Sequence, residues 1–120
     1  MGTKKTVVVI ESDFRMLNML KGLIERRGHK AIGASTPADA LSVISNNPKA
    51  DMVMIYIGLH EDDCGFTTAK HARNVSPNST IVLITAGSEA KNLFETQKDI
   101  GAKILEKPFN FERLFEVTGL

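Results

Sequence analysis

The stretch TVVVIESD (residues 6–13) indicates the fold class, because an unbroken apolar run is followed at once by polar residues. Residues 6–10 are β-branched and uncharged, which is typical of a strand buried on both faces of a parallel sheet. The run ends at Glu11, Ser12 and Asp13. We therefore predict a central strand over residues 6–10 with a polar carboxyl end.

Helical patterns alternate with further apolar runs along the rest of the chain. After residue 13, apolar side chains recur at a spacing of three or four, with Asp13 as a candidate N-cap and Gly28 as the stop. Thr36 and Pro37 read as a second helix start, an N-cap followed by proline at the first helical position. Five apolar strands alternating with five helices predict an α/β fold with a parallel sheet covered on both faces. The predicted strands are 6–10, 31–34, 51–57, 80–85 and 102–105, and the predicted helices are 14–27, 37–46, 65–75, 88–98 and 109–117.

Size and composition limit the function classes that the chain supports. We predict a single domain over residues 1–120, because 120 residues suffice for one core and are too few for two. A content of 42% hydrophobic and 24% charged residues argues against a disordered or membrane protein. Fifteen basic and fourteen acidic residues leave a net charge of +1, and the cations are scattered without a sustained stripe, so we expect no nucleic-acid binding.

The amino terminus and the cysteine content favour a cytoplasmic location. MGTKKTVVVIE (residues 1–11) has only a short apolar run before its first acidic residue, so it predicts neither a signal peptide nor a spanning helix. Cys64 is the only cysteine, which excludes an internal disulfide and a thiolate zinc site built by this chain alone. A reducing compartment and no membrane contact are expected.

The strand assignment selects a group of candidate site residues. In open parallel sheets the functional site lies outside the carboxyl ends of the strands. Neither GxxxxGK[ST] nor GxGxxG occurs, and no motif matches a histidine to a nucleophile, so we expect no enzymatic activity. The candidate site residues are Glu11, Ser12, Asp13, Tyr56, Thr85 and Lys107.

Three segments of the chain resemble the receiver domains of bacterial two-component response regulators. They are VVVIESDFRMLNMLKGLIERRGH (residues 7–29), VLITAG (82–87) and GAKILEKPF (101–109), and the resemblance spans nearly the whole chain. It implies a flavodoxin-like, CheY-like doubly wound sheet with strand order 2-1-3-4-5. It also implies that Thr85 faces a phosphoryl oxygen, that Lys107 pairs with a phosphorylated carboxylate, and that a cis peptide joins Lys107 to Pro108.

The resemblance fails where the family's chemistry is carried out. Phosphoryl transfer to a receiver needs an acceptor carboxylate and further carboxylates that hold a divalent cation. Tyr56 occupies the position of the family's acceptor aspartate, and a phenol is a poor nucleophile and a poor magnesium ligand at neutral pH. Ser12 occupies the position of the main direct metal ligand, and Ile104 stands where a switch aromatic is common. We therefore expect magnesium binding to be weak or absent and no cofactor to be needed.

Several readings of single residues stay open at this level. Tyr56 either fills the vacated pocket, mimics an occupied site, or acts as a hydrogen-bond partner for Lys107. Lys107 is expected in an ion pair with Glu11 or Asp13. Weak alternatives rebuild a metal site from Asp13, Asp62 and Asp63, whereas His60 and Cys64 are expected to be exposed.

Three functions fit these observations. The first is a pseudo-receiver that acts by phosphorylation-independent contact with a signalling protein, such as a histidine kinase, an output domain or a second receiver. The resemblance implies that this contact uses the fourth helix, the fifth strand and the final helix, and a homodimer is possible by the same surface. The second is a phosphorelay receiver with a displaced acceptor, Asp62 or Asp63. The third is a small-molecule or anion site beside Lys107.

Overall fold

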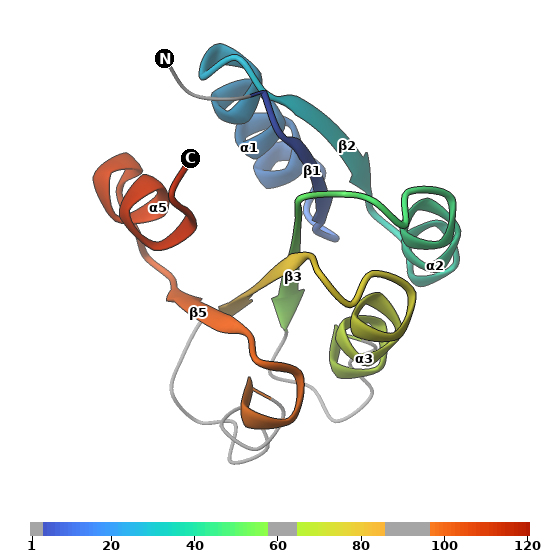
Figure 1. The fold of residues 1–120 in the computed structure, drawn as a ribbon. Coiled ribbons are helices and arrows are strands. Elements are labelled where there is room, and N and C mark those ends of the chain that lie inside the picture. The colour runs from blue at the N-terminus through green and yellow to red at the C-terminus, as the bar shows by residue number, and fades with distance from the viewer. Residues whose placement is uncertain (1–3, 58–64, 86–96) are drawn as a thin grey trace.

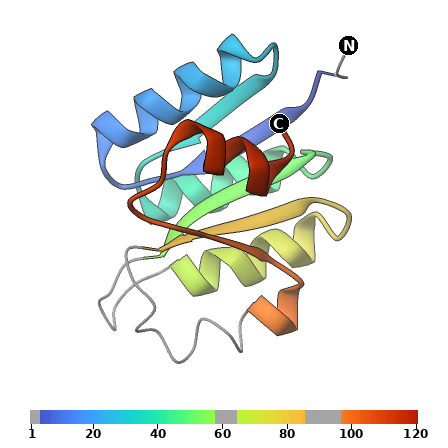
Figure 2. The same cartoon turned by 90° about the vertical axis from the view of Figure 1, so that its left-hand side faces the viewer.

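A computed structural model describes residues 4–57, 65–85 and 97–120 and contains a five-stranded parallel sheet (Figure 1). The strand order is β2-β1-β3-β4-β5, so the predicted fold class and strand order are confirmed. Figures 1 and 2 show α1 and α5 on one face of the sheet and α2 and α3 on the other. The strands are β1 (Thr6–Ile10), β2 (Lys30–Ala34), β3 (Met52–Ile57), β4 (Thr80–Thr85) and β5 (Lys103–Glu106), and the helices are α1 (Phe14–Arg26), α2 (Pro37–Asn46), α3 (Gly65–Val75) and α5 (Phe111–Thr118).

The predicted helix starts are confirmed where a capping residue was identified. The Asp13 carboxylate accepts hydrogen bonds from the backbone N–H groups that open α1, and the Thr36 hydroxyl accepts one at the start of α2. Gly28 follows α1 with a positive φ of 88°, as expected of a helix stop. Phe14 was assigned to the apolar stripe of α1, but it is 65% exposed because it is the first residue of the helix.

The start of the last helix differs from its prediction for a reason of hydrogen bonding. The last helix begins at Phe111 and not at residue 109, because the Asn110 side chain caps it by accepting from the Arg113 backbone N–H at 2.8 Å. The Lys107–Pro108 peptide bond is cis, as the resemblance implied. Most of the predicted helix 88–98 lies outside the described residues, and residues 97–100 are helical.

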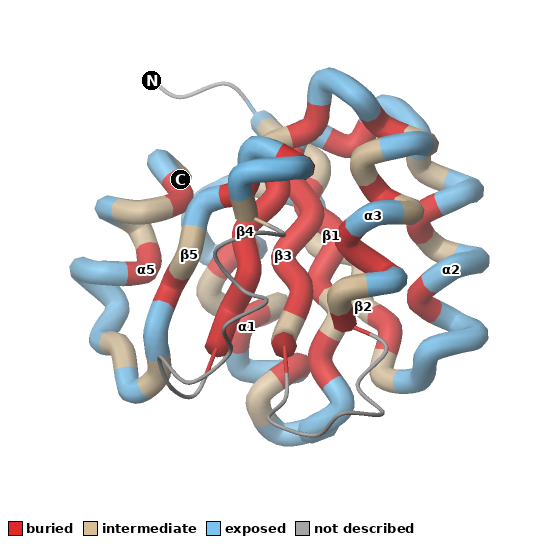
Figure 3. The backbone as a smooth tube through the Cα atoms, turned by 90° about the horizontal axis from the view of Figure 1, so that it is seen from below, coloured by how far each residue is buried: buried red, intermediate tan, exposed pale blue. Residues whose placement is uncertain are grey.

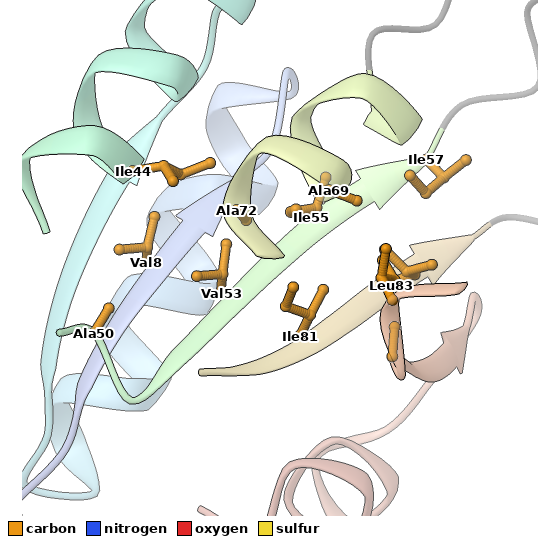
Figure 4. Packing of buried hydrophobic residues seen from close by; sticks show 12 residues of the cluster. Val8, Ile44, Ala50, Val53, Ile55, Ile57, Ala69, Ala72, Ile81 and Leu83 are labelled. Atoms are coloured by element: carbon orange, nitrogen blue, oxygen red, sulfur yellow. The ribbon is translucent and has the colours of Figure 1, made fainter. Parts of the chain in front are cut away.

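The sheet separates two apolar clusters, and its central strands are almost wholly buried (Figure 3). One cluster joins β1, β3 and β4 to α2 and α3, with Ile44, Ala69 and Ala72 as the helix contributions (Figure 4). The other joins the opposite face of the same strands to α1 and α5. None of the helices in the described ranges is long and apolar enough to cross a membrane.

Gly33 in β2 permits the close approach of α1, and this contact gives a first prediction. A Cβ atom at position 33 would lie 2.9 Å from both Leu17 Cδ1 and Lys21 Cδ, and Leu17 is buried. Gly33→Val is expected to lower the free energy of unfolding by about 1–3 kcal/mol through overpacking. Urea denaturation followed by circular dichroism measures the loss.

A second glycine provides the matched control. Gly22 lies inside α1, and a Cβ atom there would meet nothing within 4 Å. Gly22→Ala is therefore expected to raise stability by about 0.5–1 kcal/mol, the difference in helix propensity between the two residues. Equal stability of Gly33→Val and the native chain would contradict the close packing of α1 on β2.

Candidate functional site

The candidate site lies at the carboxyl edge of the sheet, where the ends of β1, β3, β4 and β5 meet. Hydrogen bonding between neighbouring strands continues one residue beyond the strand ends. The Glu11 backbone N–H donates to the Ala34 carbonyl at 3.1 Å. The Lys107 backbone N–H likewise donates to the Thr85 carbonyl at 2.7 Å. Residues 96 positions apart, Glu11 and Lys107, are thereby brought to one edge.

Glu11 and Lys107 form a partly buried ion pair at this edge. Lys107 Nζ lies 2.8 Å from Glu11 Oε1, and the side chains are 22% and 2% exposed. The prediction that Lys107 pairs with Glu11 or Asp13 is thus resolved in favour of Glu11. Glu11 Oε2 is also buried and has no hydrogen-bond partner among the described residues. Removing Lys107 would leave this carboxylate without its one described cationic partner.

The ammonium group of Lys107 lies over the face of the Tyr56 ring. Lys107 Nζ lies 4.1 Å from the centroid of the Tyr56 ring, which is the geometry of a cation–π contact. Side chains alternate along β3, so Tyr56 packs on the cluster of α1 and α5, whereas Ile57 packs on the cluster of α2 and α3. Tyr56 therefore fills the space beside Lys107. Sequence reasoning considered a hydrogen bond here and missed the contact through the ring face.

The remaining candidates occupy different environments. The Asp13 carboxylate is engaged by α1, since Oδ1 accepts from the backbone N–H groups of Arg15 at 2.9 Å and Met16 at 3.4 Å. Ser12 is exposed beside it. Thr85 ends β4, is 1% exposed, and pairs with Glu106 in the register of β4 and β5. Asp62, Asp63, His60 and Cys64 lie outside the described residues.

The Glu11 and Asp13 carboxylates at this edge are already engaged through one oxygen each, which is a poor fit to a magnesium ion. A magnesium site needs hard oxygen ligands, most often carboxylates, in near-octahedral array. Glu11 Oε1 is engaged by a cation and Asp13 Oδ1 by a helix end, while Tyr56 presents its ring to Lys107, so that Glu11 Oε2 is the one buried carboxylate oxygen of the described residues without a partner. Within residues 4–57, 65–85 and 97–120, no group of three or more His, Cys, Asp or Glu side chains is placed to hold a metal.

A groove lies next to the site on the outer side of β5. Its volume is about 510 Å³, and it runs between the helical turn at residues 97–100, β5 and α5. Ile104, the residue at the position where the resemblance implies a switch aromatic, lines the groove, and Phe111 at the start of α5 is 54% exposed. The described lining residues are Gln97, Ile104, Glu106, Pro108 and Arg113.

Sequence comparisons relate the chain to signalling proteins of bacteria. The profile of a family described as the response regulator receiver domain matches residues 7–118. The chain is 28% identical over 112 residues to the transcriptional regulatory protein CitT of Bacillus subtilis, which covers 92% of the chain and 49% of CitT. It is 27% identical over 113 residues to ZraR of Salmonella typhimurium, covering 94% of the chain and 25% of ZraR. The chain thus spans about half of one of these relatives and a quarter of the other.

Solved structures show the same relationship. A two-component response regulator from Clostridium difficile superimposes with a TM-score of 0.82 at 29% identity, covering 94% of this chain and 91% of that one. A CheY-like receiver domain protein from Methanospirillum hungatei JF-1 superimposes with a TM-score of 0.85 at 21% identity, covering 98% and 92%. The second likeness supports the fold alone.

Proposed function

This chain belongs to the response regulator receiver domain family of two-component signalling, and we propose that it is a pseudo-receiver. It signals by contact with a partner protein, without accepting a phosphoryl group. The observation that carries the proposal is the position of Lys107, which lies 2.8 Å from a Glu11 oxygen and over the Tyr56 ring. A receiver lysine in that position has its charge balanced before any phosphoryl group arrives.

The chemistry of position 56 supports the same proposal. An acceptor carboxylate attacks phosphorus as an anion, whereas a phenol without an activating base beside it is a weak nucleophile. The missing carboxylate at position 12 removes a direct ligand for the cation that would neutralise the transferred group. Two losses at one site weaken both steps of the reaction, nucleophilic attack and charge neutralisation. We accordingly propose neither a bound magnesium ion nor catalysis by this chain.

The alternative of an anion site beside Lys107 is less well supported. An incoming anion would have to compete with a carboxylate already 2.8 Å from the ammonium group and 98% buried. Like charges at this distance repel strongly in a low-dielectric environment. The alternative of a displaced acceptor at Asp62 or Asp63 depends on residues outside the described ranges, and the titration below separates it from the proposal.

The partner surface that we propose is formed by β5, α5 and the groove between them. Phe111 is 54% exposed, and Ile104 and Pro108 add apolar area to the groove lined by Arg113 and Glu106. The groove thus combines polar, charged and apolar side chains, a mixture that is ordinary for a non-obligate protein interface. A histidine kinase, an output domain, or a receiver, including a second copy of this chain, would suit this surface.

An amide NMR titration of the native chain with magnesium and beryllofluoride, a phosphoryl mimic, tests the pseudo-receiver proposal. We expect no saturable shifts for the amides of Tyr56, Thr85 and Lys107, because the mimic needs a carboxylate and a metal to bind. The Tyr56→Asp/Ser12→Asp variant is the positive control. Saturable, magnesium-dependent shifts in the native chain would restore a phosphorelay role, and their location at Asp62 or Asp63 would identify a displaced acceptor.

A further inference from the structure

Five cations gather at the end of the molecule opposite the candidate site. They come from three segments: the lead-in to β1, the end of α1, and the start of β2. Figure 2 shows these segments at one end of the sheet, away from the carboxyl ends of the strands. We call this surface the basic pole, and its residues are Lys4, Lys5, Arg26, Arg27 and Lys30.

Hydrogen bonds hold the three segments against one another. The Lys5 backbone N–H donates to His29 Nδ1 at 3.0 Å, and the Lys30 backbone N–H donates to the Lys5 carbonyl at 2.9 Å. Arg27 places its guanidinium 3.8 Å from the centroid of the Phe115 ring, which connects the end of α1 to α5. The cations therefore project from a fixed scaffold, although they are far apart in the sequence.

The basic pole lacks compensating charge in the part of the chain that the structure describes. Its five cations form no ion pair there, since the ion pairs among the described residues are Lys107–Glu11 and Arg113–Glu116. Acidic residues do lie in and beside these segments: Glu25 precedes Arg26 on α1, Asp51 Oδ2 accepts from the Thr6 backbone N–H at 2.8 Å, and Glu116, next to Phe115, is paired with Arg113. An unbalanced group of like charges repels itself and attracts a polyanion.

The residue types of the basic pole favour one class of polyanionic partner over the others. The exposed large apolar residues of the described chain are Phe14, Met19, Leu41 and Phe111, and none of them belongs to the three segments of the basic pole. Protein interfaces depend on buried apolar or aromatic anchors, and stable binding to a membrane surface combines cations with inserted apolar side chains or a lipid anchor. Unpaired cations suffice to bind a nucleic-acid backbone, because they neutralise its phosphates and displace the counterions held there.

We propose that the basic pole binds the phosphate backbone of a nucleic acid without reading its sequence. The sequence expectation of no nucleic-acid binding depended on the linear scatter of the cations, and the fold removes that scatter. Nothing in this proposal involves the strand-end site, so it stands or falls independently of the pseudo-receiver proposal.

Fluorescence anisotropy with a labelled 20-base-pair DNA duplex tests the proposal on the full chain. We expect a Kd of about 1–100 µM near physiological salt, in the range of non-specific binding. Neutralising three to five phosphates predicts a slope of log K against log salt of about −2.7 to −4.5, so affinity falls about 40- to 500-fold between 50 and 200 mM salt. No binding up to about 100 µM protein at 50 mM salt would overturn the proposal.

Matched variants assign the binding to the basic pole. Arg26→Glu/Lys30→Glu is expected to weaken binding at least tenfold. Arg26→Gln/Lys30→Gln is expected to weaken binding less, and it adds no negative charge at the carboxyl end of α1. Arg15→Glu/Lys70→Glu changes the net charge equally at exposed positions elsewhere and is expected to bind within about twofold of the native chain. Equal losses in the two reversal variants would overturn the assignment.

Two further probes exclude other polyanions. A 20-residue polyglutamate peptide represents an acidic protein segment, and vesicles with one quarter phosphatidylserine represent a membrane surface. We expect both to bind more weakly than the duplex at the same salt concentration. Tighter binding of either probe would overturn the nucleic-acid proposal and assign the basic pole to that class of partner.

Discussion

Replacing Lys107 with alanine is expected to lower the free energy of unfolding by about 2–4 kcal/mol. The loss arises because Glu11 is only 2% exposed and would lose the ammonium group at 2.8 Å that compensates for the burial of its carboxyl group. The expected value lies below that for a fully buried pair, because the Lys107 side chain is 22% exposed and water reaches the site. Urea denaturation of both chains at neutral pH measures the difference.

Two control variants separate the buried pair from a general effect of charge. The Arg113–Glu116 pair is 3.1 Å apart but 57% and 69% exposed, so Arg113→Ala is expected to change stability by less than about 1 kcal/mol. Glu11→Leu/Lys107→Met removes both charges and is expected to restore most of the stability lost in Lys107→Ala. Equal losses in Lys107→Ala and Arg113→Ala would show that burial of Glu11 does not determine the energetics of the site.

The parts of the fold that local sequence determines were predictable. The run from Thr6 to Ile10 is apolar because both faces of β1 are covered, and Asp13 and Thr36 cap helices through hydrogen bonds to residues two or three positions away. Parallel topology then followed from the alternation of strands and helices. The start of α5 was misplaced because Asn110, its cap, was not considered.

The parts that depend on distant residues were only partly predictable. Selecting the strand ends identified Glu11, Tyr56 and Lys107 as neighbours, but not that the lysine lies over the ring, since that depends on side-chain rotamers. The basic pole has only a weak linear signal, the adjacent pairs Lys4-Lys5 and Arg26-Arg27. Its members lie up to 26 positions apart, from Lys4 to Lys30, and become one surface only through the pairing of β1 with β2.

Restoring a carboxylate at position 56 alone is expected to leave magnesium binding weak, whereas restoring positions 56 and 12 together should produce a clear site. Tyr56→Asp introduces a carboxylate beside Lys107, whose ammonium group lies 4.1 Å from the centroid of the present ring. The ammonium group would compete with the metal ion for this carboxylate. Ser12→Asp adds a second anion that Lys107 does not already neutralise. A unit charge about 4 Å from a divalent cation contributes about 2 kcal/mol even in water, so the double variant should bind magnesium 10- to 100-fold more tightly than Tyr56→Asp.

Isothermal titration calorimetry with magnesium chloride measures this difference for Tyr56→Asp, Ser12→Asp and the double variant. Tyr56→Asn/Ser12→Asn is the matched control, because it has nearly the same shape without the two charges and is expected to bind no more tightly than the native chain. Equal affinities of Tyr56→Asp and the double variant would mean that the hydroxyl of Ser12 is no obstacle. The loss at position 56 would then be the sole reason for weak binding, and a one-residue change would separate this chain from a phosphate-accepting receiver.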